Sequence, residues 1–172
     1  MQELICSVRN VDGKDVTSND IVPSLLIEIP HGATETVHFQ QYVQQLSGPF
    51  PENLVDFFHV NTDVGAPECA EEIAKAYVRL FPDRRVQIVR CHIPRTFIDC
   101  NRVIDGNAAA FAAGKVTPGI PSYVRNSTDC SYLRRQYVRY HQIVQEAFLR
   151  VCSAGGCAIF LHSYAPKTVG IS

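Results

Sequence analysis

The chain lacks an excess of either charge, a long apolar run and a leader-like start. Its 172 residues carry 16 Lys and Arg against 17 Asp and Glu, a formal net charge of −1. Nucleic-acid and anionic-membrane binding favour a basic excess. No stretch approaches the roughly 20 apolar residues needed to cross a bilayer. The first residues also lack the basic and apolar regions of a secretory signal. We therefore expect a cytoplasmic protein with no membrane and no nucleic-acid partner.

Cysteine pairs at metal-binding or redox spacing are missing as well. The seven cysteines are scattered and include no C-x-x-C, which argues against a disulfide framework and against a cysteine-ligated zinc. Small buried thiols in a reducing compartment are the simpler interpretation. Cys100, between Asp99 and Asn101, is the best candidate for a nucleophilic cysteine. No G-x-S-x-G motif indicates a serine nucleophile.

The pattern of elements predicts an α/β fold in a single domain, residues 1–172, because a domain averages roughly 150 residues. Strands are expected over 24–29, 54–60, 85–93 and 157–162, and helices over 36–46, 67–80 and 130–152. Such alternation is typical of a three-layer α/β/α architecture with a mostly parallel or mixed central sheet. Residues 103–127, rich in Ala, Gly and Pro, form either a binding loop or a disordered segment.

The helix predicted over 130–152 has two distinct faces. Its apolar face consists of Leu133, Tyr137, Tyr140, Val144, Ala147, Phe148 and Val151. Its polar face includes Arg134, Arg135 and Arg139, which we interpret as a solvated surface.

Two histidines and one carboxylate follow predicted strands. His31 comes after strand 24–29, Asp63 after strand 54–60, and His162 ends strand 157–162. Ligands of open α/β sheets bind beyond the carboxyl ends of the strands. Two imidazoles and a carboxylate leave one open position on zinc, as catalytic sites require. The alternative is that these histidines are structural residues held by hydrogen bonds.

Arginine and a third histidine add to this pattern. Asp99, Asn101 and Arg102 lie within four residues, and a planar guanidinium binds a carboxylate through two parallel hydrogen bonds. The alternative for Arg102 is a structural ion pair with Asp99. His141 lies at the edge of the apolar face of the predicted helix, where it either reaches the site or packs as a half-buried structural residue.

In this order and spacing, five segments resemble the N-formylglutamate amidohydrolase family, which is similar to zinc carboxypeptidases and aspartoacylases. They are I-P-H-G-A-T-E at 29–35, N-T-D at 61–63, P-R-T-F-I-D-C-N-R at 94–102, R-Y-H at 139–141 and L-H-S-Y-A-P at 161–166. The resemblance spans the chain from about residue 24 onward. It implies a zinc-carboxypeptidase-like α/β/α fold around a mixed sheet.

The resemblance also implies a ligand set for one zinc ion. His31 and His162 match the histidine ligands, and we favour Asp63 as the acidic ligand. Glu35 is the second choice, because the acidic ligand of zinc carboxypeptidases lies shortly after the first histidine. In this sequence Glu35 stands one residue later than that pattern.

Arg102, helped by Asn101, resembles the clamp for a substrate carboxylate, and Asp99 is expected to orient that clamp. Arg95 and His141 are further pocket candidates. The implied reaction is hydrolysis of an N-acyl amide of an acidic amino acid, such as N-formyl-L-glutamate. The implied partner is therefore a small acidic N-acyl amino acid.

The chain departs from the family at its end. It stops ten residues after His162, whereas family members continue, and the general-base glutamate of the carboxypeptidase-like enzymes lies on a later strand. No residue takes that role by motif, so the catalytic residue is unassigned, with Glu35 and His141 as weak candidates and Glu68 as a further one. The alternatives are a fragment, a natural short form, or a non-catalytic relative that binds an acidic amino acid derivative. An uncovered sheet edge would favour a homo-oligomer or a covering partner.

Overall fold

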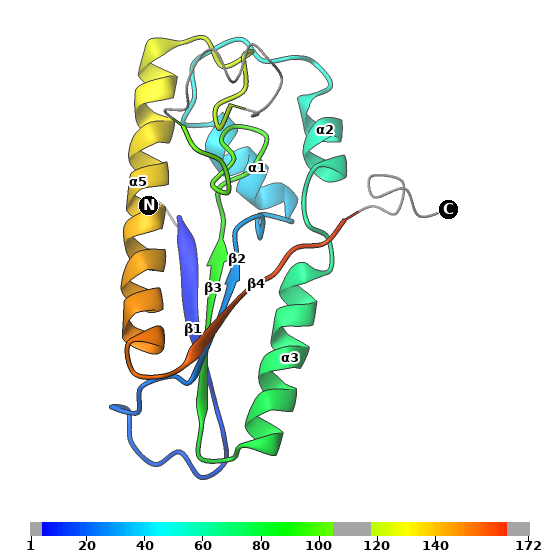
Figure 1. Ribbon diagram of the computed structural model, residues 1–172. Helices are drawn as coiled ribbons and strands as arrows, with labels where there is room; N and C mark the ends of the chain where they lie inside the picture. Colours follow the sequence, from blue (N-terminus) through cyan, green and yellow to red (C-terminus); the bar gives the residue numbers. More distant parts are fainter. Residues whose placement is uncertain (1–4, 105–117, 165–172) are drawn as a thin grey trace.

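A four-stranded mixed sheet forms the centre of the computed structural model, which describes residues 5–104 and 118–164 (Figure 1). The strands are β1 (Cys6–Asp12), β2 (Leu25–Ile29), β3 (Arg85–Cys91) and β4 (Cys157–Phe160), in the order β1-β3-β2-β4. β2 pairs in parallel with both β3 and β4, whereas β1 runs antiparallel to β3. The expected α/β class with a mixed sheet is therefore confirmed.

Helices cover both faces of this sheet and give three layers. The described helices are α1 (Thr36–Val43), α2 (Leu54–Val60), α3 (Ala66–Leu80) and α5 (Ser127–Cys152). In Figure 1, α5 and α3 flank the sheet on opposite sides. α3 lies close to its face because Ala70 and Ala74, four residues apart, are both fully buried against Ile27 and Ile88.

The opposite face carries the larger core. Leu133, Tyr140 and Val151 of α5 are fully buried against Leu26 and Val89 of the sheet. α1 and α2 add aromatic side chains to the same cluster near the carboxyl ends of β2 and β3. All five residues of β2 are buried, because this strand is paired on both sides and covered on both faces.

Two sequence predictions about the elements are wrong. Residues 54–60 form helix α2, not a strand: Leu54 and Phe58 are its buried residues, four apart. Aromatic and β-branched residues in L-V-D-F-F-H-V imitate a strand, but the burial follows helical spacing. The sequence does not predict strand β1, because its central residues are exposed and polar residues interrupt its apolar ones, as in S-V-R-N-V.

The long helix is close to its expected position. α5 begins at Ser127, where the Asn126 side chain caps the first turn by accepting the N–H groups of Thr128 and Asp129. Within the predicted apolar face, Phe148 is 40 % exposed and lies outside the core. The predicted loop or disordered segment 103–127 falls largely outside the described residues, which resume at residue 118.

Candidate metal centre

Three loops bring the predicted ligands together. His31 follows β2, Asp63 lies in the turn between α2 and α3, and His162 follows β4. Asp63 therefore follows a helix, not the strand predicted before it. One ligand atom from each residue lies within 4.8 Å of the other two. Asp63 Oδ2 is 3.0 Å from His162 Nδ1 and 3.5 Å from His31 Nδ1.

The backbone around these loops requires glycine at two positions. A Cβ at Gly32 would lie 2.6 Å from Arg90 Cγ and 3.0 Å from the Cys91 carbonyl, so only glycine fits beside His31. Gly65 has φ +83° and caps α3, so the chain can turn sharply after Asp63. The Thr62 hydroxyl donates to the Ala33 carbonyl at 2.9 Å and ties the two loops together.

Asp99 binds the ring nitrogen of His31 that faces away from Asp63. Its Oδ1 accepts a hydrogen bond from His31 Nε2 at 2.8 Å. With Nε2 donating, the Nδ1 atom of His31 is the one directed at the Asp63 carboxylate. Metal-ligating histidines typically have this arrangement, in which a second carboxylate fixes the tautomer and the ring. Asp99 also accepts from Arg95 Nε and from the Asn101 backbone N–H, each at 2.8 Å.

The two carboxylates and His31 shift one another's pKa values. Burial disfavours a charged His31, but the Asp63 and Asp99 carboxylates outweigh it and raise the pKa of this histidine. Burial acts to raise the pKa of Asp99, yet His31 and Arg95 hold it at about 2. Asp63 also has a lowered pKa, because His31 and His162 outweigh its burial.

One buried atom of this group lacks a hydrogen bond. His31 Nδ1 is buried and makes no hydrogen bond to the described residues. A buried polar atom without a partner is costly unless something else satisfies it. Two imidazole nitrogens and a carboxylate oxygen are a donor set that suits zinc. The side chains of His31, Asp63 and His162 thus fit a divalent ion, with Asp99 fixing one of them.

The predicted substrate-binding residues lie beside the same group. Arg102 Nε is 3.6 Å from Asp99 Oδ2, and the Arg102 side chain is 41 % exposed. The Asn101 amide lies 3.5 Å from His162 Nε2. Arg95 and Asp99 line a cavity of about 360 Å³, together with residues of α2 and the segment 118–123. Asp99, which also bonds His31, is thus the residue shared by this cavity and the ligand group.

Other candidates do not join the group. Glu35 begins α1, is 58 % exposed at its side chain, and pairs with Arg90 at 2.9 Å. It is not among the residues that could hold the ion. His141 Nε2 donates to the Cys100 carbonyl at 3.0 Å. The Cys91 thiol and burial raise the pKa of Cys100, which is the opposite of what a nucleophilic cysteine needs.

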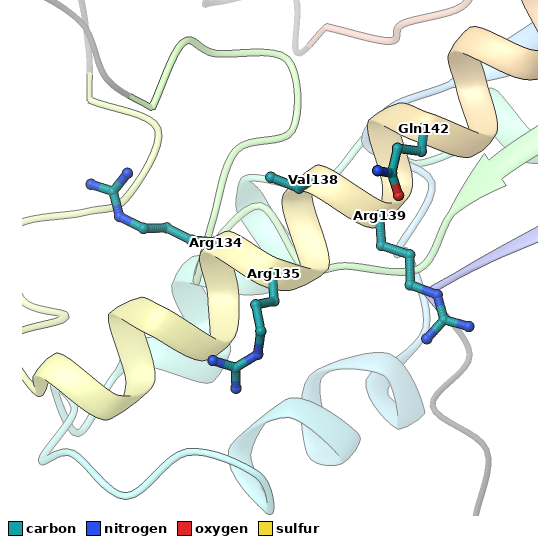
Figure 2. Close-up of a pocket in the computed structure, with 5 residues that line it drawn as sticks. All are labelled: Arg134, Arg135, Val138, Arg139 and Gln142. Atoms are coloured by element: carbon teal, nitrogen blue, oxygen red, sulfur yellow. The ribbon is translucent and has the colours of Figure 1, made fainter.

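A second hollow on the surface of α5 lies apart from these residues. It is lined by Arg134, Arg135, Val138, Arg139 and Gln142. Figure 2 shows the three guanidinium groups pointing away from one another. They do not converge on a common anion, which agrees with the solvated helix face expected from the sequence.

Sequence reasoning missed the link between Asp99 and His31. It assigned Asp99 only to the arginine clamp. The two residues are 68 positions apart, and no spacing rule pairs a carboxylate with a histidine over that distance. The available signal was the strand end that precedes His31, which places its ring at the edge where other loops meet.

No family model, curated protein or solved structure matches the chain. None of the described helices is both long and apolar enough to span a membrane.

Proposed function

We propose that the protein is a zinc-dependent amidohydrolase that cleaves the N-acyl amide of an acidic amino acid, such as N-formyl-L-glutamate. The main support is the convergence of His31, Asp63 and His162, with Asp99 behind His31. The motif resemblance supplies the substrate class and a zinc-carboxypeptidase-like fold. The seven free thiols agree with a cytoplasmic location.

In this proposal the chain's own residues bind and orient. His31, Asp63 and His162 hold the ion, which when bound supplies a Lewis acid and lowers the pKa of water. Arg102, and Arg95 at the wall of the cavity, bind the substrate carboxylate through guanidinium hydrogen bonds. Asn101 lies between His162 and this clamp. Binding the carboxylate fixes the amide next to the ligand group.

Metal content of the purified chain tests the centre. We expect about one zinc per chain in the wild type and loss of zinc in His31→Ala and in His162→Ala. His59 is exposed on α2 and is not one of the three proposed ligands. His59→Ala is therefore the matched control and should keep its zinc. Full zinc content in both ligand variants would refute the assignment.

Hydrolysis of N-formyl-L-glutamate, followed as release of formate, tests the activity. Turnover should need zinc and should fall at least tenfold in Arg102→Ala through a higher KM. Turnover that persists in the presence of a chelator would refute a zinc-dependent reaction.

A specific observation favours a second candidate, a non-catalytic protein that binds an acidic amino acid derivative. Both carboxylates of the described site are already engaged: Asp63 lies among the ligands, and Asp99 bonds His31 and Arg95. Neither is left as a general base. In this case N-formyl-L-glutamate raises the melting temperature without being hydrolysed. Arg102→Ala should abolish that rise.

The expected homo-oligomer is also a proposal. β4 is an edge strand of the described sheet, and its Phe160 side chain is 55 % exposed. Light scattering of the purified chain tests it, and a monomeric mass across the accessible concentration range would exclude it.

A further inference from the structure

One side of α5 makes polar contacts near the metal centre that the proposed function does not use. Tyr137, Tyr140 and His141 are spaced three and four residues apart, so they share a helix face. The Tyr137 hydroxyl donates to the Arg102 carbonyl at 3.0 Å. His141 Nε2 donates to the Cys100 carbonyl, also at 3.0 Å. Two consecutive turns of α5 thus hold the backbone of the loop 99–102.

This loop carries the groups that contact both histidine ligands. Asp99 bonds His31 Nε2 at 2.8 Å, and the Asn101 amide lies 3.5 Å from His162 Nε2. The carbonyl that His141 holds belongs to Cys100, the residue between them. A shift of this carbonyl therefore moves both neighbours at once.

The third residue of the face anchors the helix to the sheet. The Tyr140 hydroxyl donates to Glu28 Oε1 at 2.7 Å, and Tyr140 is fully buried. Glu28 is 5 % exposed in β2, three residues before His31. This bond fixes the rotation of α5 at the turn that carries His141. The His141 ring also packs on the Tyr137 ring, with centroids 4.1 Å apart.

We propose that His141 is a positioning residue for the metal centre, which sets the loop 99–102 so that Asp99 and Asn101 meet the two histidine ligands. The inference rests on the proposed metal centre but assigns His141 a place outside it. His141 acts through a backbone carbonyl, and its Nε2–H group is the donor that matters. Glu28 and Tyr140 hold the helix turn from which it reaches the loop.

Two variants separate the donor from the bulk of the side chain. His141→Gln places an amide N–H near the position of Nε2, whereas His141→Leu keeps volume and removes the donor. Val151→Ala is the control, because Val151 is fully buried at the other end of α5 and tests a general loss of helix packing. Circular dichroism checks that all the variants fold.

Cobalt(II) titration gives the first measurement, since its visible absorption reports the ligand geometry as well as the affinity. We expect His141→Leu to bind cobalt(II) about tenfold more weakly with a shifted spectrum. His141→Gln should stay within about threefold of the wild type, and Val151→Ala should keep the wild-type spectrum. Wild-type affinity and spectrum in His141→Leu, or an equal change in Val151→Ala, would overturn the proposal.

Nuclear magnetic resonance of the metal-free chain gives a measurement that does not depend on metal. The Asp99 carboxylate only accepts, so His31 Nε2 carries the proton of their bond, and that proton has its own resonance. We expect it to shift or broaden in His141→Leu and to be retained in His141→Gln and Val151→Ala. An unchanged resonance in His141→Leu overturns the positioning role. A wild-type chain that binds no cobalt(II) refutes the proposed function instead, and the resonance then decides the positioning role alone.

Discussion

Replacing Asp99 with asparagine tests the electrostatic design of the site most directly. The Asp99 carboxylate accepts three hydrogen bonds at 2.8 Å, from His31 Nε2, Arg95 Nε and the Asn101 backbone N–H. Asparagine has the same shape, but one of its two terminal atoms is a donor. Whichever way the amide turns, a donor faces a donor and at least one of these bonds is lost.

The expected loss of zinc affinity follows from the hydrogen bond that Asp99 makes to the ligand His31. Removal of such a supporting carboxylate typically weakens metal binding 10- to 100-fold, which is about 1.4–2.8 kcal/mol. Because Asp99 is buried and its negative charge is held by His31 and Arg95, we expect Asp99→Asn near the upper end. Folding stability should fall by about 1–3 kcal/mol as well, since Arg95 loses a charged partner.

Competition with a chromophoric chelator at neutral pH measures the zinc affinity of the variant. The control is Asp12→Asn, which also removes a carboxylate that pairs with an arginine, here Arg85, at the opposite end of β3. It should lose stability but keep zinc affinity. Zinc binding of Asp99→Asn within threefold of the wild type would refute the reasoning.

Three further results are expected. Burial, His38 and Arg90 lower the pKa of His92 to about 4, so the folded chain binds fewer protons than the unfolded chain between pH 6.5 and 4. The free energy of unfolding should therefore decrease as the pH is lowered through that window, by at most about 3.4 kcal/mol, and decrease less steeply in His92→Leu, as followed by urea unfolding. Glu35→Gln should keep zinc affinity within twofold; a tenfold loss would make Glu35 the acidic ligand in place of Asp63. Leu133→Ala should cost about 2–5 kcal/mol of unfolding free energy, because Leu133 is fully buried.

Much of the fold could be predicted because several segments carry periodicity and clear ends. β2 is an apolar run interrupted only by Glu28 and ended by Pro30, and the predicted helix that begins at Pro67 matches α3 closely. The pattern of residues 54–60 predicts a strand, because a seven-residue segment rich in Val and Phe is typical of a buried strand as well as of a short helix. β1 was missed because an exposed edge strand has no apolar run, and its pairing with β3 is a long-range contact.

Part of the candidate site can be predicted from the sequence for related reasons. His31 and His162 lie where a parallel sheet gathers its loops, so strand ends alone bring them to one edge. Asp63 follows a helix, and its place depends on the turn N-T-D-V-G and on the bond from Thr62 to Ala33. The turn residues of this segment point to a loop at Asp63, even though the strand predicted before it is a helix.

What the sequence does not specify is which polar groups are paired. The sequence contains Asp63 and Asp99 as equivalent carboxylates, and only their surroundings distinguish them. Asp63 Oδ2 accepts from His162 Nδ1 at 3.0 Å and from the Ser163 N–H at 3.2 Å, and it lies 3.5 Å from His31 Nδ1, so it adjoins both histidines. Asp99 accepts three N–H groups and bonds only one of the two histidines. The first is therefore suited to be a ligand and the second a support. Under the positioning role proposed for His141, this division depends on packing between α5, the loop 99–102 and β2, since α5 bonds both the loop that carries Asp99 and the strand that precedes His31.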